Sequence, residues 1–387
     1  MEASAAIAIP PARSDARSVA IPWFCHAFVV SATSILVGLL WDISWHTTIG
    51  RDSFWTPAHV LIYLGGVIAG CTGGFLVLRT TLAGSAAERA ASVRVWGMRG
   101  PYGAWLAIWG AFAMIASAPF DDWWHNAYGL DVQILSPPHT VLAMGMMGVV
   151  LGAVVVVMAM QNRGEGNVTW FRWMYVYCAG VMVTLLGILL SEYCYPNRQH
   201  GGFFYVVACA AFPFVMLTFG RASQLCWPVT AVTACYTMLL LVIDWGLELF
   251  PATPKLAPIY NPLDHMAPFG FPLLLIVPAI GIDLVIRRLE GRRNFVLAVA
   301  AGATFFVLLL AVQWPFAIFL LSPAADNAVF MGGRFFSYAD HYGAWMFQFW
   351  SDRDPFTATS ALIAIGMAVV SAWLGLRRGN RLRKVLR

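Results

Sequence analysis

Residues 138–160 read PHTVLAMGMMGVVLGAVVVVMAM and contain no charged side chain. About 20 apolar helical residues cross the roughly 30 Å hydrocarbon core of a bilayer, so this stretch is long enough to span a membrane. Comparable apolar runs recur along the whole chain, which predicts an all-α, polytopic membrane bundle of about ten transmembrane helices. The expected spans are 20–41, 57–78, 102–119, 138–160, 171–192, 202–220, 225–248, 267–286, 295–321 and 356–376.

The composition agrees with this fold class. Of the 387 residues, 60% are hydrophobic and 11% are charged, whereas about a quarter of the residues in a soluble domain are charged. These values exclude a soluble enzyme and a disordered chain, and they make the lipid bilayer, not nucleic acid, the expected partner. The seven cysteines include no Cys-x-x-Cys pair, so neither a disulfide framework nor a thiolate metal site is indicated.

The basic residues are distributed unevenly between the two sides of the expected bundle. Of the 24 Lys and Arg residues, 19 lie in alternate connections and in the two chain ends. Cytoplasmic loops of membrane proteins collect Lys and Arg, so both termini are expected in the cytoplasm of a multi-pass protein of a bacterial inner membrane. Seven of the eight histidines lie at the opposite, periplasmic ends of the spans.

Two connections on that side share one pattern of acidic, aromatic and histidine residues. In each, an aspartate is followed four residues later by a histidine that a tryptophan precedes. A glycine, a second aspartate and a Pro-x-His element then follow at nearly the same spacing, which is typical of a duplicated helix pair. The shared residues are Asp42, His46, Asp52 and His59 in the first connection, and Asp121, His125, Asp131 and His139 in the second.

This spacing favours metal binding. Residues four apart on a helix lie about 6 Å apart on one face, and a proline at the start of the next helix presents its histidine from across the hairpin. One carboxylate and two imidazoles suit copper, zinc or non-haem iron. The remaining aspartates, Asp52 and Asp131, are placed to accept the second ring N–H of a ligand histidine, or in the case of Asp52 to pair with Arg51. The alternative is that these residues only anchor helix ends at the membrane interface.

The first connection also resembles a known signature. Asp42-x3-His46-x3-Gly50-Arg51-Asp52-x3-Thr56-Pro57-x-His59 is similar to the Asp-x3-His-x4-Arg-Asp-x3-Thr-Pro-x-His pattern in a metal-binding membrane subunit of the copper membrane monooxygenases. That family includes the particulate methane and ammonia monooxygenases. Asp121-x3-His125 and Pro137-x-His139 resemble the second metal site of the same monooxygenase polypeptide, in the same order along the chain.

The resemblance implies a copper ion at Asp42, His46 and His59, and another at Asp121, His125 and His139. The family usually has Asn where this chain has Asp121. The similarity covers roughly residues 20–160, so the expected organisation is a monooxygenase-like four-helix unit, 1–160, followed by six additional spans, 161–387.

Two functions follow from these observations. The first is an oxidoreductase that hydroxylates a small apolar substrate with dioxygen at a copper site, with Asp52 and Asp131 orienting the ligands or relaying protons. Such an enzyme could work with further membrane proteins or as a homo-oligomer. The second is a non-enzymatic protein that acquires, stores or delivers copper. The sequence leaves the choice open.

The C-terminal half holds a weaker set of similar residues. Asp244 and Glu248 lie one helical turn apart, and Asp264 and His265 follow before the next expected span. These four residues are either a divergent third copy of the duplicated unit or an ordinary outer loop, and we favour the loop.

Overall fold

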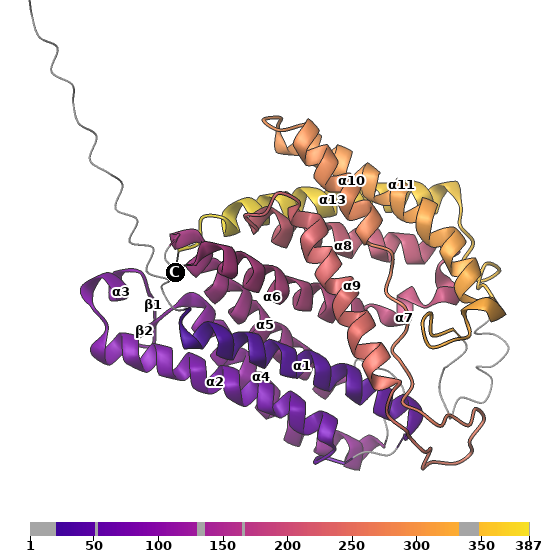
Figure 1. Ribbon diagram of the computed structural model, residues 1–387, viewed down its shortest axis with the longest axis horizontal. Coiled ribbons are helices and arrows are strands. Elements are labelled where there is room, and N and C mark those ends of the chain that lie inside the picture. The colour runs from indigo at the N-terminus through magenta and orange to yellow at the C-terminus, as the bar shows by residue number, and fades with distance from the viewer. Residues whose placement is uncertain (1–20, 51–52, 130–135, 165–166, 333–347, 387) are drawn as a thin grey trace, which may run out of the picture.

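The computed structural model describes residues 21–50, 53–129, 136–164, 167–332 and 348–386. Within these ranges the chain is a bundle of long helices, shown in Figure 1, and nine of them are long and apolar enough to cross a membrane. The nine are α1 (Trp23–Thr48), α2 (Pro57–Ala83), α4 (Tyr102–Tyr128), α5 (Pro137–Arg163), α6 (Val168–Leu189), α8 (Gly202–Ala222), α9 (Pro228–Leu247), α11 (Asn294–Leu320) and α13 (Ala358–Leu382).

The remaining elements are short and lie between these helices. They are α3 (Ala86–Ala90), the hairpin strands β1 (Val93–Val95) and β2 (Met98–Gly100), α7 (Ser191–Cys194), α10 (Ile276–Arg288) and two 3₁₀ turns at Pro196–Arg198 and Pro323–Ala325.

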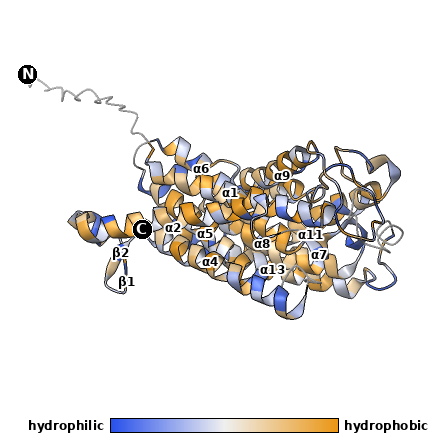
Figure 2. Cartoon of the chain, turned by 90° about the horizontal axis from the view of Figure 1, so that it is seen from below, coloured by the Kyte–Doolittle hydropathy of each residue, from blue (hydrophilic) through white to orange (hydrophobic). Residues whose placement is uncertain are grey.

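The outer surface of the bundle is apolar. Figure 2 shows hydrophobic residues over most of the helical body, and large side chains such as Leu64, Phe112 and Leu362 are exposed there. Water does not favour such a surface, whereas hydrocarbon does, so these faces contact lipid. The predicted all-α, polytopic membrane fold is confirmed.

The first four spans pack closely through small residues. On α4, a Cβ atom at Gly110 would lie 2.5 Å from the backbone nitrogen of Val149 on α5, and one at Gly145 would lie 2.8 Å from the Gly110 carbonyl. On α1, the Ser31 hydroxyl donates to the Gly65 carbonyl of α2 at 2.7 Å. Small residues and interhelical hydrogen bonds replace the hydrophobic effect, which lipid does not supply between helices. These contacts fix the two hairpins that carry the duplicated residues.

The later helices form the other side of the molecule, coloured magenta to yellow in Figure 1. The two sides are in contact through α1, α5 and α6, where the hydroxyls of Thr33 and Tyr177 lie 2.6 Å apart. Within the later helices, Asp283 of α10 accepts hydrogen bonds from the backbone nitrogens of Val229 and Thr230 at the start of α9. Residue 160 therefore lies between two parts of one bundle that pack against each other. That it is a boundary between domains stays a prediction.

The expected helical span 267–286 is wrong over its first half. The helix α10 begins only at Ile276, and residues 266–275 before it are not helical. Pro268, Gly270 and Pro272 account for the break, because proline lacks an N–H group and glycine gains little from a helix. Hydropathy registers the apolar side chains of this stretch but not its backbone.

Polar side chains of neighbouring helices satisfy the backbone of this non-helical stretch. Asp244 of α9 accepts from the Phe269 nitrogen at 3.1 Å, and Gln313 of α11 accepts from the Leu274 nitrogen at 2.9 Å. The amide of Gln313 in turn donates to Gln199 at 2.7 Å. Non-helical backbone at membrane depth is tolerated only where protein or water satisfies it, and here side chains do so.

The described part of the chain begins and ends at the same end of the bundle. Near the C-terminus, the carbonyls of Leu382 and Val385 accept from the Asn162 amide at the end of α5. Trp23 at the start of α1 contacts Phe75 near the end of α2, at a ring distance of 5.4 Å. Nine long helices alone would leave these two ends at opposite ends of the bundle, so residues 266–275 and α10, here called the interrupted span, account for a further pass along the bundle.

Candidate metal centres

The first hairpin joins the C-terminal end of α1 to the N-terminal end of α2. The helix α1 continues past the predicted end of its span to Thr48, so Asp42 and His46 lie one turn apart within it. The helix α2 begins at Pro57 after the N-cap residue Thr56, as the Pro-x-His element predicts. Its first turn carries His59 back toward α1.

The three side chains of this hairpin converge. Oδ1 of Asp42 lies 2.9 Å from Nε2 of His59 and 3.8 Å from Nε2 of His46. The side chains of Asp42 and His59 are 18% and 19% exposed, and that of His46 is 49% exposed. The cluster, here called the first centre, is therefore open to solvent on the His46 side.

The second hairpin repeats this construction with α4 and α5. Asp121 and His125 lie one turn apart near the end of α4, which stops at Tyr128 before Gly129. Gly129 has a φ of +86°, a conformation that favours glycine. The helix α5 begins at Pro137, and its N-cap residue Ser136 accepts a hydrogen bond from the backbone nitrogen of His139.

Its three side chains converge in the same way. Oδ1 of Asp121 lies 3.3 Å from Nε2 of His139 and 3.5 Å from Nε2 of His125. About a third of each side chain is exposed. In each of the two clusters one potential ligand atom per residue lies within 4.8 Å of the others. We call this cluster the second centre.

Backbone carbonyls orient one histidine of each centre. Nδ1 of His59 lies 3.0 Å from the Ser53 carbonyl, and Nδ1 of His125 lies 3.0 Å from the Gly129 carbonyl. A carbonyl oxygen only accepts hydrogen bonds, so the proton is on Nδ1 and the lone pair of the neutral ring is on Nε2. Metal-binding histidines are oriented in this way in known sites.

The sequence did not reveal these two carbonyls. It instead predicted that Asp52 and Asp131 accept a ring N–H, but both residues lie outside the part of the chain that the structure describes. Their roles stay predictions. For the second centre, the sequence signal for such a carbonyl was Gly129, the glycine that follows the first histidine of the hairpin. The chain reverses at this residue, so its own carbonyl points back at the ring of His125.

The donor sets fit a transition-metal ion. Two ligand atoms about 2.1 Å from an ion at tetrahedral angles are about 3.4 Å apart, and the Asp–His distances here run from 2.9 to 3.8 Å. Each set offers one carboxylate and two imidazoles, which suit copper, zinc or iron and leave coordination positions for other ligands.

The two centres lie at the same level of the bundle. Along the antiparallel contact of α2 with α4, Gly66 faces Met114 and Gly73 faces Ala104. Continuing this register by seven residues toward the hairpins reaches His59 on α2 and Asp121 on α4. The duplicated hairpins therefore place both sets of ligands at the same end of the protein.

The possible third copy does not assemble a third cluster. Among the described residues, only the two sets above bring three metal-binding side chains together. Asp244 instead accepts from the backbone of Phe269, and Asp264 pairs with His265 at 2.9 Å. These residues support the interrupted span and its connection, in agreement with the favoured loop interpretation.

Comparisons with family models, curated proteins and solved structures found no match for this chain.

Proposed function

We propose that the protein is a membrane-embedded copper oxidoreductase, in which an Asp/His/His centre supports the oxygen-dependent hydroxylation of a small apolar substrate. The observation that carries this proposal is the convergence of Asp42, His46 and His59 from two helices, repeated at the second centre. Belts of aromatic and polar anchors at a membrane interface need no such convergence. The similarity of the first hairpin to the signature of the copper membrane monooxygenases supports copper over zinc and iron.

The chain's own residues would hold the ion and leave room for reactants. Asp42 supplies a negative charge, and the Ser53 carbonyl keeps Nε2 of His59 directed at the site. A bound copper ion would supply one-electron redox chemistry with dioxygen. The reaction converts R–H, dioxygen, two electrons and two protons into R–OH and water, so it requires a two-electron reductant such as a hydroquinone.

The first experiment is turnover. Copper-loaded protein in lipid nanodiscs is supplied with a hydroquinone and tested with short alkanes, alkenes and ammonia for products that incorporate labelled dioxygen. We expect product formation with the wild type, and its loss in His46→Ala. The control is His26→Ala, at an exposed histidine elsewhere on α1, which should form product as the wild type does. Absence of labelled product from every substrate would contradict the proposed hydroxylation activity.

Copper acquisition or delivery is the second candidate, and the exposure of the ligands favours it. The His46 side chain is half exposed, and about a third of the His125 and His139 side chains is accessible. A partner protein could reach such ligands and exchange the ion. Transfer of copper to or from a soluble chelating protein, without turnover, would support this function.

We also propose that both centres face the periplasm of a bacterial inner membrane. Arg89 and Arg99 lie between α2 and α4, at the opposite end of the bundle from the centres, as expected for the cytoplasmic side. The orientation is tested with two variants, Glu88→Cys and Trp55→Cys, each in a protein that lacks the native cysteines. Each variant is treated with a maleimide that does not cross the membrane. Labelling of intact spheroplasts at position 55 and not at position 88 is expected, and the reverse would overturn the orientation.

A further inference from the structure

The connection between α9 and α10 contacts the end of α1 that carries Asp42 and His46. This connection, here called the crossing segment, comprises residues 249–275 and runs as an orange coil in Figure 1. In its C-terminal part, the Ala267 carbonyl accepts from the Ser44 hydroxyl at 2.6 Å, and the Ala267 nitrogen donates to the Thr48 hydroxyl at 2.8 Å. Earlier in the segment, the Lys255 nitrogen donates to the Ile49 carbonyl at 3.0 Å.

These contacts hold the part of α1 that carries metal ligands. Ser44 and Thr48 are buried and flank His46, and the Thr48 hydroxyl also donates to the Ser44 carbonyl within α1. They lie about 200° around the helix from Asp42 and His46, since successive residues are about 100° apart. The end of α1 is therefore fixed between the α2 hairpin on one face and the crossing segment on another.

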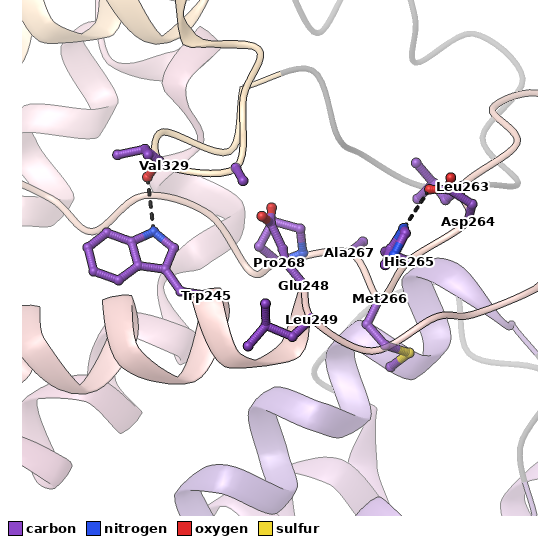
Figure 3. A pocket seen from close by; sticks show the side chains of 11 residues that line it. Trp245, Glu248, Leu249, Leu263, Asp264, His265, Met266, Ala267, Pro268 and Val329 are labelled. Atoms are coloured by element: carbon purple, nitrogen blue, oxygen red, sulfur yellow. Dashed lines mark hydrogen bonds and ion pairs between the residues drawn. The ribbon is translucent and has the colours of Figure 1, made fainter.

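The crossing segment also forms one wall of a cavity of about 750 Å³, a size typical of small-molecule sites. Figure 3 shows Trp245 of α9 on one side of this cavity and His265 and Met266 of the crossing segment on the other. The indole nitrogen of Trp245 donates to the Val329 carbonyl at 3.1 Å, which joins α9 to a third wall.

The lining defines the class of molecule that fits. Most of it is apolar, and its charged groups are the exposed carboxylate of Asp264, paired with His265 at 2.9 Å, and the carboxylate of Glu248, whose oxygens are buried in its wall. Carboxylate oxygens accept hydrogen bonds and do not donate them. An occupant with an apolar body and a hydrogen-bond-donating head, either a hydroxyl or an ammonium group, matches this lining, whereas an anionic head would face like charge.

We propose that this cavity binds such an amphipathic donor, and that its occupancy changes metal binding at the first centre through Ala267 and the end of α1. Ala267 lines the cavity and is hydrogen-bonded to Ser44 and Thr48 of α1. An occupant that displaces Ala267 therefore also displaces the end of α1, which carries the metal ligands of the first centre. The coupling rests on the proposed metal function, whereas binding in the cavity does not. The second centre, built on α4 and α5, is expected to be unaffected.

Binding is tested on metal-free protein in nanodiscs by calorimetry, with empty nanodiscs as the partition control. The probes are 4-phenylbutanol, 4-phenylbutylamine and 4-phenylbutyrate, which share one apolar body and differ in the head group. The alcohol and the amine are expected to bind and the carboxylate is not. Ala328→Phe, which fills the cavity, should abolish binding, and Ala324→Phe, outside the cavity, should not. Equal binding of the carboxylate, or binding that survives Ala328→Phe, would overturn the site.

The coupling between the cavity and the first centre is tested on two variants that each keep one centre. His125→Ala keeps the first centre intact, and His46→Ala keeps the second centre intact. The bound alcohol is expected to change the copper Kd of the first centre by at least about fivefold, the lower range of ordinary coupling between sites, and that of the second by less than about twofold. Equal changes at both centres, or no change at either, would overturn the coupling.

A valine substitution tests the route. Thr48→Val removes the acceptor of the Ala267 N–H and should abolish the coupling while the alcohol still binds. Thr47→Val, which removes a hydroxyl that donates within α1, is the matched control. Coupling that persists in Thr48→Val would contradict the proposed route. If wild-type protein bound no copper but still bound the alcohol, the metal function would fail and the cavity site would stand.

Discussion

Nε2 of His59 lies 2.9 Å from Oδ1 of Asp42, across the hairpin that joins α1 to α2. Nδ1 of the same ring donates to the Ser53 carbonyl, so a neutral His59 directs its lone pair at the carboxylate. Two acceptors at this distance repel each other unless a positive charge lies between them. A second ring proton or a metal ion supplies that charge, so protons and metal ions compete for the first centre.

This competition predicts a pH dependence of metal affinity. Because a histidine must lose its Nε2 proton to bind an ion, copper should bind at least about tenfold more weakly at about pH 5 than at about pH 8. Competition titration against a chelator of known pH dependence measures the change. An affinity that is the same at both pH values would show that the imidazoles are not ligands.

Asp42→Asn keeps the shape of the side chain and removes its charge. Loss of a group that only supports a metal ligand commonly costs about 10- to 100-fold in affinity, so replacing the carboxylate itself should weaken copper binding at the first centre by at least about 100-fold. The second centre should be unchanged. Asp122→Asn, next to a ligand but outside both clusters, is the control, and equal losses in the two variants would refute a ligand role for Asp42.

Gly129→Ala should weaken the second centre alone. The φ of +86° at Gly129 is strained for alanine, and a shift of this residue moves the carbonyl that orients His125. We expect a loss of about 10- to 100-fold in copper affinity, as for other groups that orient ligands. Gly164→Ala also places an alanine at a positive φ, +68°, in the left-handed region at the far end of α5, and should leave both affinities unchanged.

Gly110→Ala should destabilise the α4–α5 pair. Its Cβ atom would lie 2.5 Å from the Val149 nitrogen, and backbone cannot move aside cheaply. Overpacking of this kind costs about 1–3 kcal/mol, which should lower the Tm measured by circular dichroism in detergent. At Gly74 no atom lies within 4 Å of an added Cβ, so Gly74→Ala should have a Tm at or above that of the wild type. The reverse order of stability would contradict this packing.

Gln313→Leu tests the interrupted span. The substitution leaves the Leu274 N–H and the Gln199 side chain without their partner, and an unsatisfied buried group costs about 1–3 kcal/mol. The Tm should fall, and backbone amides near Leu274 should exchange faster with deuterium. Gln224→Leu, at an exposed position, is the control. Unchanged exchange near Leu274 in the Gln313 variant would indicate a different backbone conformation.

The sequence predicted most of the bundle because lipid imposes a simple rule on length and polarity. The nine long helices of the described ranges each begin within three residues of a predicted span, and α5 begins one residue before the predicted 138–160. The end of α1 was missed by seven residues, since Trp41 and Asp42 lowered the hydropathy while the helix continued to Thr48. The break before Ile276 was missed because the prediction followed hydropathy, although Pro268, Gly270 and Pro272 indicated it; the residues that satisfy the broken backbone, Asp244 and Gln313, lie on other helices.

The ligand sets were predictable because their spacing is local. A carboxylate and a histidine four residues apart share a helix face wherever that helix lies, and a short hairpin returns the second histidine. The contact of Ala267 with Ser44 and Thr48 was not predictable, because it joins segments more than 200 residues apart. No periodicity or motif in either segment indicates the other.

Metal content after single ligand substitutions tests the central claim most directly. Copper-loaded protein, washed and analysed by mass spectrometry and by X-ray absorption at the copper edge, should contain two equivalents per chain with nitrogen and oxygen neighbours. His59→Ala and His139→Ala should each remove one equivalent, and the double variant both. Wild-type protein without copper, or full copper content in the double variant, would contradict the account.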